Sequence, residues 1–116
     1  EIITSVSGVN IQQNGKVTAI FNRNLDVIGE IDVYKFDALK GQDLIVSMIS
    51  AVIDTHLELI DPEGNVEMKV DDSGGSTTAT IIRELSSSGL YTLYARSATQ
   101  GTGELGLYTI NFQLSP

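Results

Sequence analysis

Apolar and polar residues alternate along much of the chain, a pattern that is typical of β-strands with one buried face. The alternation is cleanest in two segments near the C-terminus, residues 90–96 and 107–114, where one of the two alternating sets is entirely apolar. The sequence predicts that these sets point inward: Tyr91, Leu93 and Ala95, then Tyr108, Ile110 and Phe112.

The same alternation predicts strands in the earlier part of the chain. In residues 31–36 it places Asp32, Tyr34 and Phe36 together on one face. The other face of that segment carries Ile31, Val33 and Lys35. Further strands are predicted at residues 6–11, 17–21, 56–59, 66–70 and 78–83.

The most apolar run, residues 44–53, fits two different periods. Apolar residues occupy both faces if it is a strand, which is typical of a central strand, while the spacing of Leu44, Met48 and Val52 also fits a helix. Since β-branched residues dominate the run and turn signals flank it closely, a strand is the preferred interpretation.

Turn signals separate the predicted strands at short intervals. Asn14-Gly15 is typical of a tight hairpin, because such a turn needs positive φ. In Asp61-Pro62-Glu63-Gly64 the proline presets φ and the glycine accepts the left-handed position. Lys40-Gly41-Gln42 predicts another turn, and residues 71–75 predict an acidic loop rich in glycine.

Composition supports an all-β fold. The 116 residues suit one domain, residues 1–116, and include 13 isoleucines, 9 valines and 10 threonines, whose branched side chains favour strands. Many short strands with regular turns predict a sandwich or a barrel. The chain begins at Glu1 with neither a methionine nor a leader, so we expect an excised domain or a processed product.

Charge and residue usage exclude several classes of function. The net charge of −8 argues against nucleic acid and anionic membranes as partners, since both require basic patches. Without cysteine there are no disulfides, thiolate metal sites or cysteine nucleophiles, and a single histidine excludes zinc sites built from histidine clusters. The longest apolar run is too short to span a bilayer.

Six motifs in order carry a family resemblance. The segment 29–36 looks like a "D-x-Y-x-F" strand, and 38–44 resembles the turn that follows it. Residues 54–65 are similar to "D-T-x-L-x-L-x-D-x-x-G-N", Asp71-Asp72 matches a DD pair, and 88–93 and 106–110 resemble two closing "G-x-Y" strands. This order resembles the bacterial pre-peptidase C-terminal domain over residues 29–112.

The resemblance implies a jelly-roll-like antiparallel β-sandwich of about eight strands, similar in build to the collagen-binding modules of clostridial collagenases. It implies a non-catalytic accessory domain of a secreted enzyme, often a peptidase, that serves in attachment to a substrate or surface, in secretion or in stabilisation. Its partners would be the adjacent enzyme domain and an extracellular protein or polysaccharide polymer. The alternative is a structural or adhesive sandwich module of a cell-surface protein.

Calcium is the sharpest chemical hypothesis. Calcium takes six to eight oxygen ligands, and loops at one end of such a sandwich could bring together Asp54, Asp71 and Asp72. The opposing interpretation is that Asp54 caps a turn and that the acidic pair lies in a solvated loop. Family members that bind calcium tightly often carry an acidic cluster before the first core strand, where this chain offers only the thinly spaced Asp26, Glu30 and Asp32.

Two further candidates lie on predicted strands. Asp54 and His56 share a face and invite a catalytic-triad interpretation, but no serine lies in a nucleophile-elbow context, so we expect a solvent-facing histidine and no catalysis. Tyr94 alternates away from Tyr91 and, with Arg96, could form a patch that contacts peptide or collagen. The alternative for this pair is an ordinary polar outer face.

Overall fold

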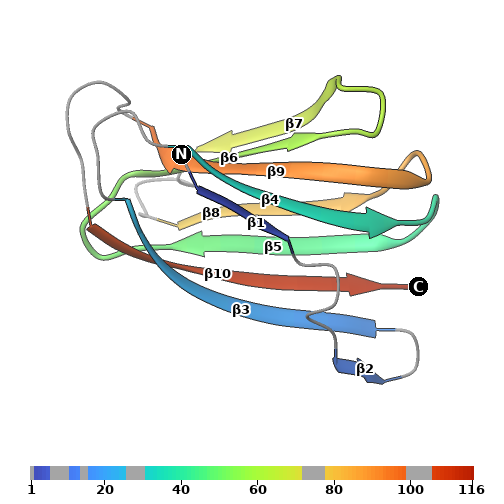
Figure 1. Ribbon diagram of the computed structural model, residues 1–116, viewed down its shortest axis with the longest axis horizontal. Coiled ribbons are helices and arrows are strands. Elements are labelled where there is room, and N and C mark those ends of the chain that lie inside the picture. The colour runs from blue at the N-terminus through green and yellow to red at the C-terminus, as the bar shows by residue number, and fades with distance from the viewer. Residues whose placement is uncertain (1, 6–10, 14–15, 26–30, 72–77, 99–105) are drawn as a thin grey trace.

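The computed structural model of the chain describes residues 2–5, 11–13, 16–25, 31–71, 78–98 and 106–116, and these form a β-sandwich (Figure 1). Two five-stranded sheets pack face to face. The described residues contain no helix long and apolar enough to cross a membrane. The strands are β1 (Ile2–Ser5), β2 (Ile11–Gln13), β3 (Lys16–Leu25), β4 (Ile31–Ala38), β5 (Asp43–Ile49), β6 (Thr55–Ile60), β7 (Val66–Asp71), β8 (Thr78–Glu84), β9 (Gly89–Ser97) and β10 (Gly106–Ser115).

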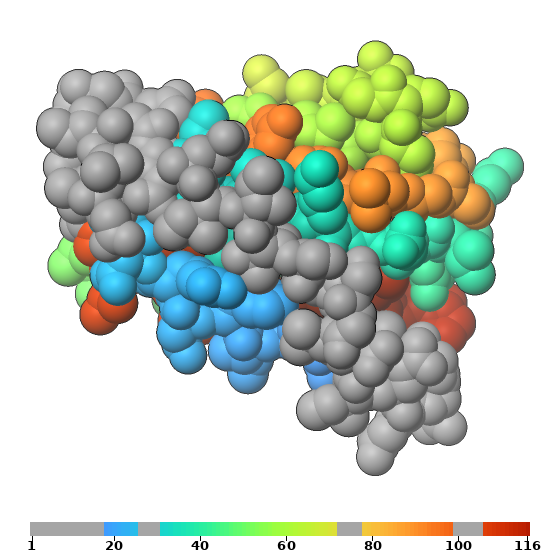
Figure 2. Space-filling model, viewed as in Figure 1, coloured from blue at the N-terminus to red at the C-terminus, as the bar shows by residue number. Residues whose placement is uncertain are grey.

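The strand order confirms the jelly-roll-like sandwich. One sheet has the order β1-β4-β9-β6-β7 and the other has the order β2-β3-β10-β5-β8. The short strands β1 and β2 lie at the edges, and the remaining eight form two antiparallel four-stranded sheets, as in a jelly roll built from two Greek keys. In the space-filling view from the same side, β7 lies at the top and β3 in the lower half (Figure 2).

The core lies between the two sheets and contains the residues predicted to point inward. Phe36 from β4 stacks on Tyr91 from β9 with ring centroids 5.6 Å apart, and it meets Phe112 from β10 edge to face at 4.9 Å. The contact between Phe36 and Phe112 joins the two layers, while Phe36 and Tyr91 are neighbours within one sheet. The six residues predicted from alternation are all buried: Tyr91, Leu93, Ala95, Tyr108, Ile110 and Phe112.

The apolar run at residues 44–53 begins as strand β5, which settles its two possible periods in favour of a strand. The strand ends at Ile49, and the hydroxyl of the next residue, Ser50, accepts hydrogen bonds from the backbone N–H groups of Val52 and Ile53. β5 lies between β10 and β8, as expected for a central strand, but only one of its faces is covered. Ile45 and Ile49 on the other face are 38% and 40% exposed.

The turns follow the predicted chemistry where the structure describes them. Asp61 uses one carboxylate oxygen to accept hydrogen bonds from the N–H groups of Glu63 and Asn65, and Gly64 takes a φ of 89°. Asn14-Gly15 lies outside the described residues, although β2 and β3 on either side pair antiparallel as a hairpin requires.

A β-bulge interrupts the regular alternation predicted for residues 66–70. The register between β6 and β7 shifts between Leu59 and Ile60, and the side chain of Glu67 is only 5% exposed. Glu67 accepts hydrogen bonds from Arg83 at 3.1 Å and from Ser86 at 2.8 Å. The bulge therefore turns a carboxylate toward the second sheet, and the ion pair with Arg83 on β8 links the edges of the two layers.

Candidate functional site

The outer face of the sheet β4-β9-β6-β7 carries most of the residues singled out from the sequence. Strand register places Arg96 of β9 opposite His56 of β6, and His56 opposite Asp71 of β7. Glu58 follows His56 on the same face, opposite Tyr94 of β9. We refer to Asp71, His56, Glu58 and Arg96 as the charged row.

Hydrogen bonds join the charged row into one cluster. The Nδ1 atom of His56 contacts Oδ1 of Asp71, and Nε2 lies 2.9 Å from Oε2 of Glu58. Arg96 donates from Nη2 to Glu58 at 3.2 Å and from Nη1 to the carbonyl oxygen of Ser97 at 3.0 Å. The cluster therefore ties together three neighbouring strands.

Both ring nitrogens of His56 are engaged. Nδ1 can donate to Asp71, while Nε2 donates to Glu58 when the ring is charged, or accepts from Arg96 Nη2, 3.1 Å away, when the ring is neutral. The residue is 7% exposed, so the expected solvent-facing histidine lies on the outer face but is covered by its neighbours. A general base needs a nitrogen within reach of a substrate proton, and this ring offers none.

Glu58 contacts both His56 and Arg96 within the charged row. Burial of its carboxyl would raise the pKa, but the hydrogen bonds from His56 and Arg96 and the charges of these side chains lower the pKa below its ordinary value. The carboxylate is therefore ionised at neutral pH and holds the Arg96 guanidinium in place.

The three predicted calcium ligands are placed in part. Asp71 lies opposite His56, and Asp54 precedes the first residue of β6, so both are at the same end of the β6–β7 pair. Asp72 lies outside the described residues, and the carboxylate of Asp71 is bonded to His56. Within the described part of the chain, no group of three acidic, histidine or cysteine side chains gathers to hold a metal. A calcium site would need Asp72 to complete it.

Tyr94 and Arg96 lie side by side on the outer face and are half-buried. Arg96 is oriented by Glu58 and by the Ser97 carbonyl oxygen, so its guanidinium is held rather than free in solvent. A fixed arginine beside a tyrosine ring is a combination that is enriched in protein-binding surfaces. The contact of this pair with a peptide or a polymer stays a prediction.

A second polar cluster, which sequence reasoning missed, lies inside the sandwich. Tyr108 of β10 donates a hydrogen bond to Oδ2 of Asp32 on β4, and its oxygen lies 2.6 Å from the hydroxyl oxygen of Tyr34. Asp32 is 2% exposed. The signal was present in the sequence, since alternation placed Asp32 with Tyr34 and Phe36 on the face that turns out to be buried.

The buried environment shifts the pKa values of both tyrosines. Burial raises the pKa of Tyr34 to about 12, with a further increase from the Asp32 carboxylate that Arg23 and Tyr108 partly offset. Burial also raises the pKa of Tyr108, and Tyr34 and Asp32 add to that shift. This cluster therefore holds its phenol protons at neutral pH and acts as a fixed hydrogen-bonded link between the sheets.

No protein-family model matches this chain, and no curated protein sequence matches it either. Solved structures match it over nearly its whole length. PliG from Aeromonas hydrophila, a periplasmic inhibitor of g-type lysozyme, has a TM-score of 0.69 at 17% identity, and the match covers 98% of each chain. PliG from Salmonella Typhimurium has a TM-score of 0.66 at 22% identity, covering 99% of each chain.

The pre-peptidase C-terminal domain of the collagenase from Bacillus anthracis also matches. Its TM-score is 0.65 at 18% identity, and the match covers 99% of this chain and 94% of that domain. Because the identities are 22% or lower, the likeness shows the fold alone. The resemblance to the pre-peptidase family is thus confirmed as a shared β-sandwich, and PliG inhibitors share this fold equally.

Proposed function

We propose that this chain is a non-catalytic binding module of an extracytoplasmic protein, serving as an accessory domain of a secreted enzyme, in particular a peptidase. The observation that carries the proposal is the match to the pre-peptidase C-terminal domain of a collagenase over 99% of the chain. The quoted motifs support it: Asp32 and Tyr34 build the buried link between the sheets, and Asp61 and Gly64 form the β6–β7 turn.

The absence of catalysis is part of the proposal. His56 is the side chain best suited to general base chemistry, but its two ring nitrogens are engaged by the charged row and its ring is nearly buried. The half-buried pair near it on the outer face, Tyr94 with the oriented Arg96, suits recognition of another molecule. A protein polymer is the favoured ligand, because tyrosine and arginine commonly dominate protein-binding surfaces.

A sedimentation assay tests the proposal. The purified chain is mixed with insoluble collagen fibrils and, separately, with cellulose and chitin, and the bound fraction is measured. We expect retention on a protein polymer, weakened about tenfold or more by Tyr94→Ala. Thr109→Ala on the opposite sheet is the matched control and should bind normally.

Two outcomes contradict this function. One is the absence of retention on collagen, cellulose and chitin alike. The other is turnover of peptide or ester substrates by the purified chain that His56→Ala removes. If the flanking sequence contains tandem copies of this domain instead of a hydrolase, the structural or adhesive alternative replaces the accessory role.

Inhibition of another enzyme is a second candidate function. It is favoured by one specific observation: the match to Aeromonas hydrophila PliG covers 98% of both chains, so a complete periplasmic inhibitor has the dimensions of this chain. The chain is added to a g-type lysozyme acting on a cell-wall suspension, with a lysozyme of another type as the specificity control. Selective loss of g-type activity would support inhibition, and unchanged clearing of the suspension by both lysozymes would exclude it.

A further inference from the structure

The outer face of the sheet β3-β10-β5-β8 differs in character from the rest of the molecule. It presents four isoleucines to solvent: Ile20 is 68% exposed, Ile45 38%, Ile49 40% and Ile82 69%. We call this surface the isoleucine face. The described outward-pointing residues of these strands are uncharged from the row that contains Asn24 and Leu107 to the row that contains Gln113 and Ile45. The chain as a whole nevertheless carries a net charge of −8.

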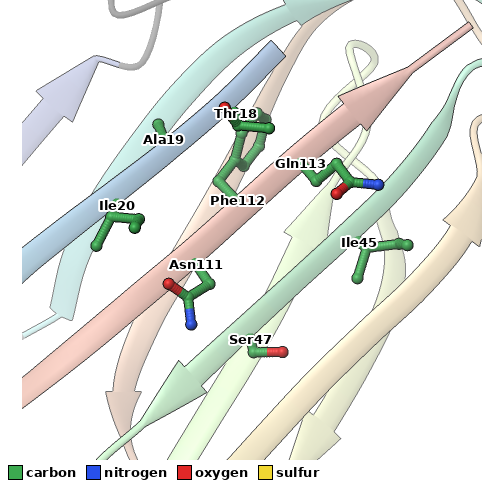
Figure 3. A pocket seen from close by; sticks show the side chains of 8 residues that line it. All are labelled: Thr18, Ala19, Ile20, Ile45, Ser47, Asn111, Phe112 and Gln113. Carbon is green, nitrogen blue, oxygen red and sulfur yellow. The ribbon is translucent and has the colours of Figure 1, made fainter. Parts of the chain in front are cut away.

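The isoleucine face is hollowed along its middle. A depression with a volume of about 500 Å³ runs over β3, β10 and β5. Figure 3 shows Ile20, Asn111, Ser47, Gln113 and Ile45 around it. Aliphatic side chains that surround a hollow leave a continuous apolar surface in water, and such a surface marks an interaction site more often than scattered single residues do.

Two side-chain amides give this hollow a polar lining that can bind a peptide. Asn111 and Gln113 lie on β10 between the isoleucines, and within the described residues neither amide group makes a hydrogen bond. An amide group both donates and accepts, so it matches the N–H and C=O groups of a neighbouring main chain. Neutral amides among aliphatic groups therefore suit a protein segment.

At one end of the isoleucine face, the part formed by β5 and β8 is acidic. Asp43 of β5 pairs directly with Glu84 of β8, one row beyond the pair Ile45–Ile82 on the same face. Both acids are exposed, and neither forms an ion pair among the described residues. Like charges directly opposite each other destabilise a sheet, and a cation from outside would relieve the repulsion.

We propose that the isoleucine face binds a protein segment that presents aliphatic side chains with lysine or arginine at one end. The aliphatic groups fill the hollow beside Ile20 and Ile45, and the basic group lies between Asp43 and Glu84. A second copy of this chain fits less well, because each copy carries a net charge of −8 and would repel the other. This surface is on the sheet opposite Tyr94, so the inference does not depend on the function proposed above.

The test uses three synthetic peptides and the uniformly labelled chain. The first peptide carries leucine at alternate positions and lysine at one end, the second replaces the lysine with glutamine, and the third replaces it with glutamate. Amide chemical shifts are followed by NMR during each titration. We expect the lysine peptide to perturb residues of β3, β10, β5 and β8, the glutamine peptide to bind about tenfold or more weakly, and the glutamate peptide not to bind.

Matched variants separate the apolar and the ionic contributions. Ile45→Thr combined with Ile82→Thr should weaken the lysine peptide about tenfold or more, while Leu90→Thr on the other sheet should not change its affinity. Glu84→Gln should weaken it more than Glu63→Gln, which removes the same charge from a distant turn. Thermal unfolding establishes whether each variant is folded. If a variant is not folded, the map of shift changes in the unmodified chain still shows which face binds the peptide.

Several results would overturn the inference. Shift changes confined to the sheet with Tyr94 would place the basic segment elsewhere. Equal binding of the lysine and glutamine peptides would remove the role of Asp43 and Glu84. A concentration-dependent dimer in sedimentation that dissociates on Ile45→Thr would assign the face to a second copy of this chain.

Discussion

The hydroxyl of Tyr108 donates a hydrogen bond to the carboxylate of Asp32 across the interior of the sandwich, between residues 76 positions apart in the chain. Tyr108 belongs to β10 in one sheet and Asp32 to β4 in the other. Tyr34 extends the link from the same strand as Asp32. A polar bridge of this kind fixes how the two layers face each other, because a buried carboxylate that loses its donor is costly.

Tyr108→Phe should therefore destabilise the fold. The substitution keeps the ring and removes only the hydroxyl, so it deprives the buried Asp32 of a donor. We expect a loss of about 1–3 kcal/mol in the free energy of unfolding, measured by urea titration. Tyr94→Phe is the matched control on the outer face and should change stability by less than about 0.5 kcal/mol. Equal effects of the two substitutions would contradict a structural role for the bridge.

Alkaline pH should destabilise the protein through the buried tyrosines. Burial raises the pKa of Tyr34 to about 12, so the unfolded chain loses this proton near pH 10 while the folded chain keeps it. The stability that the group contributes is complete below pH 10 and declines as pH rises toward 12, by about 1.4 kcal/mol per pH unit for each such group.

Circular dichroism and absorbance of tyrosinate, followed together from pH 9 to about 12, measure this effect. Ionisation of the buried phenols should coincide with loss of the β-sheet signal. Between pH 7 and alkaline pH, Tyr34→Phe should lose less of its free energy of unfolding than the unmodified chain does. If both phenols ionised while the sheet signal stayed intact, the interpretation would be wrong.

The inward faces of the strands could be predicted because alternation is a local property of strand geometry. Tyr91, Leu93 and Phe112 follow from a period of two whatever the partners of their strands are. The bulge at Glu67 could not be predicted in this way, because it depends on how β7 pairs with β6. The local pattern also suggests that Ile45 belongs to a covered strand, whereas no described element forms a second layer on that face of the sheet.

The candidate site shows the same limit. Proximity in the sequence places Asp54 beside His56, while the carboxylates that contact the ring nitrogens belong to Asp71 and Glu58. The partner Asp71 is set by the register of β6 against β7, which a single sequence does not reveal. Asp32 and Tyr108 are still farther apart in the sequence. Alternation could assign each residue to a face of its strand, but it could not predict that the two residues contact each other.

Acid should weaken the charged row through Glu58. Its pKa is lowered in the folded chain relative to the ordinary value of 4.5, so the unfolded chain takes up this proton first as pH falls. The stability that Glu58 contributes is complete above its unfolded pKa and is lost as pH falls through its folded pKa. Glu58→Gln should therefore be less stable than the unmodified chain at pH 7 and should lose less stability on acidification.

Unfolding curves at pH 7 and at pH 3 measure the difference. Glu63→Gln, in the exposed β6–β7 turn, is the control for loss of one carboxylate. An identical pH dependence in Glu58→Gln and the unmodified chain would show that the hydrogen bonds from His56 and Arg96 do not hold this carboxylate in its ionised form.

Calcium should raise the midpoint of thermal unfolding if Asp54, Asp71 and Asp72 share an ion. The unfolding of the chain is compared in EDTA, in calcium and in magnesium as the charge control. A ligand at a hundred times its dissociation constant adds about 2.7 kcal/mol, and each kcal/mol moves the midpoint of a domain of this size by roughly 4 °C or more. We expect a rise of several degrees that is specific for calcium and absent in Asp54→Asn and Asp71→Asn.

His56→Gln separates the two roles of Asp71. The carboxylate of Asp71 contacts His56, so Asp71→Asn lowers the midpoint even in EDTA, whatever its role toward calcium. His56→Gln removes the same contact and leaves all three carboxylates in place. The calcium-dependent rise should therefore persist in His56→Gln and disappear in Asp71→Asn. If the midpoint does not respond to calcium in any form of the chain, Asp71 serves only the charged row and the acidic loop is a solvated turn.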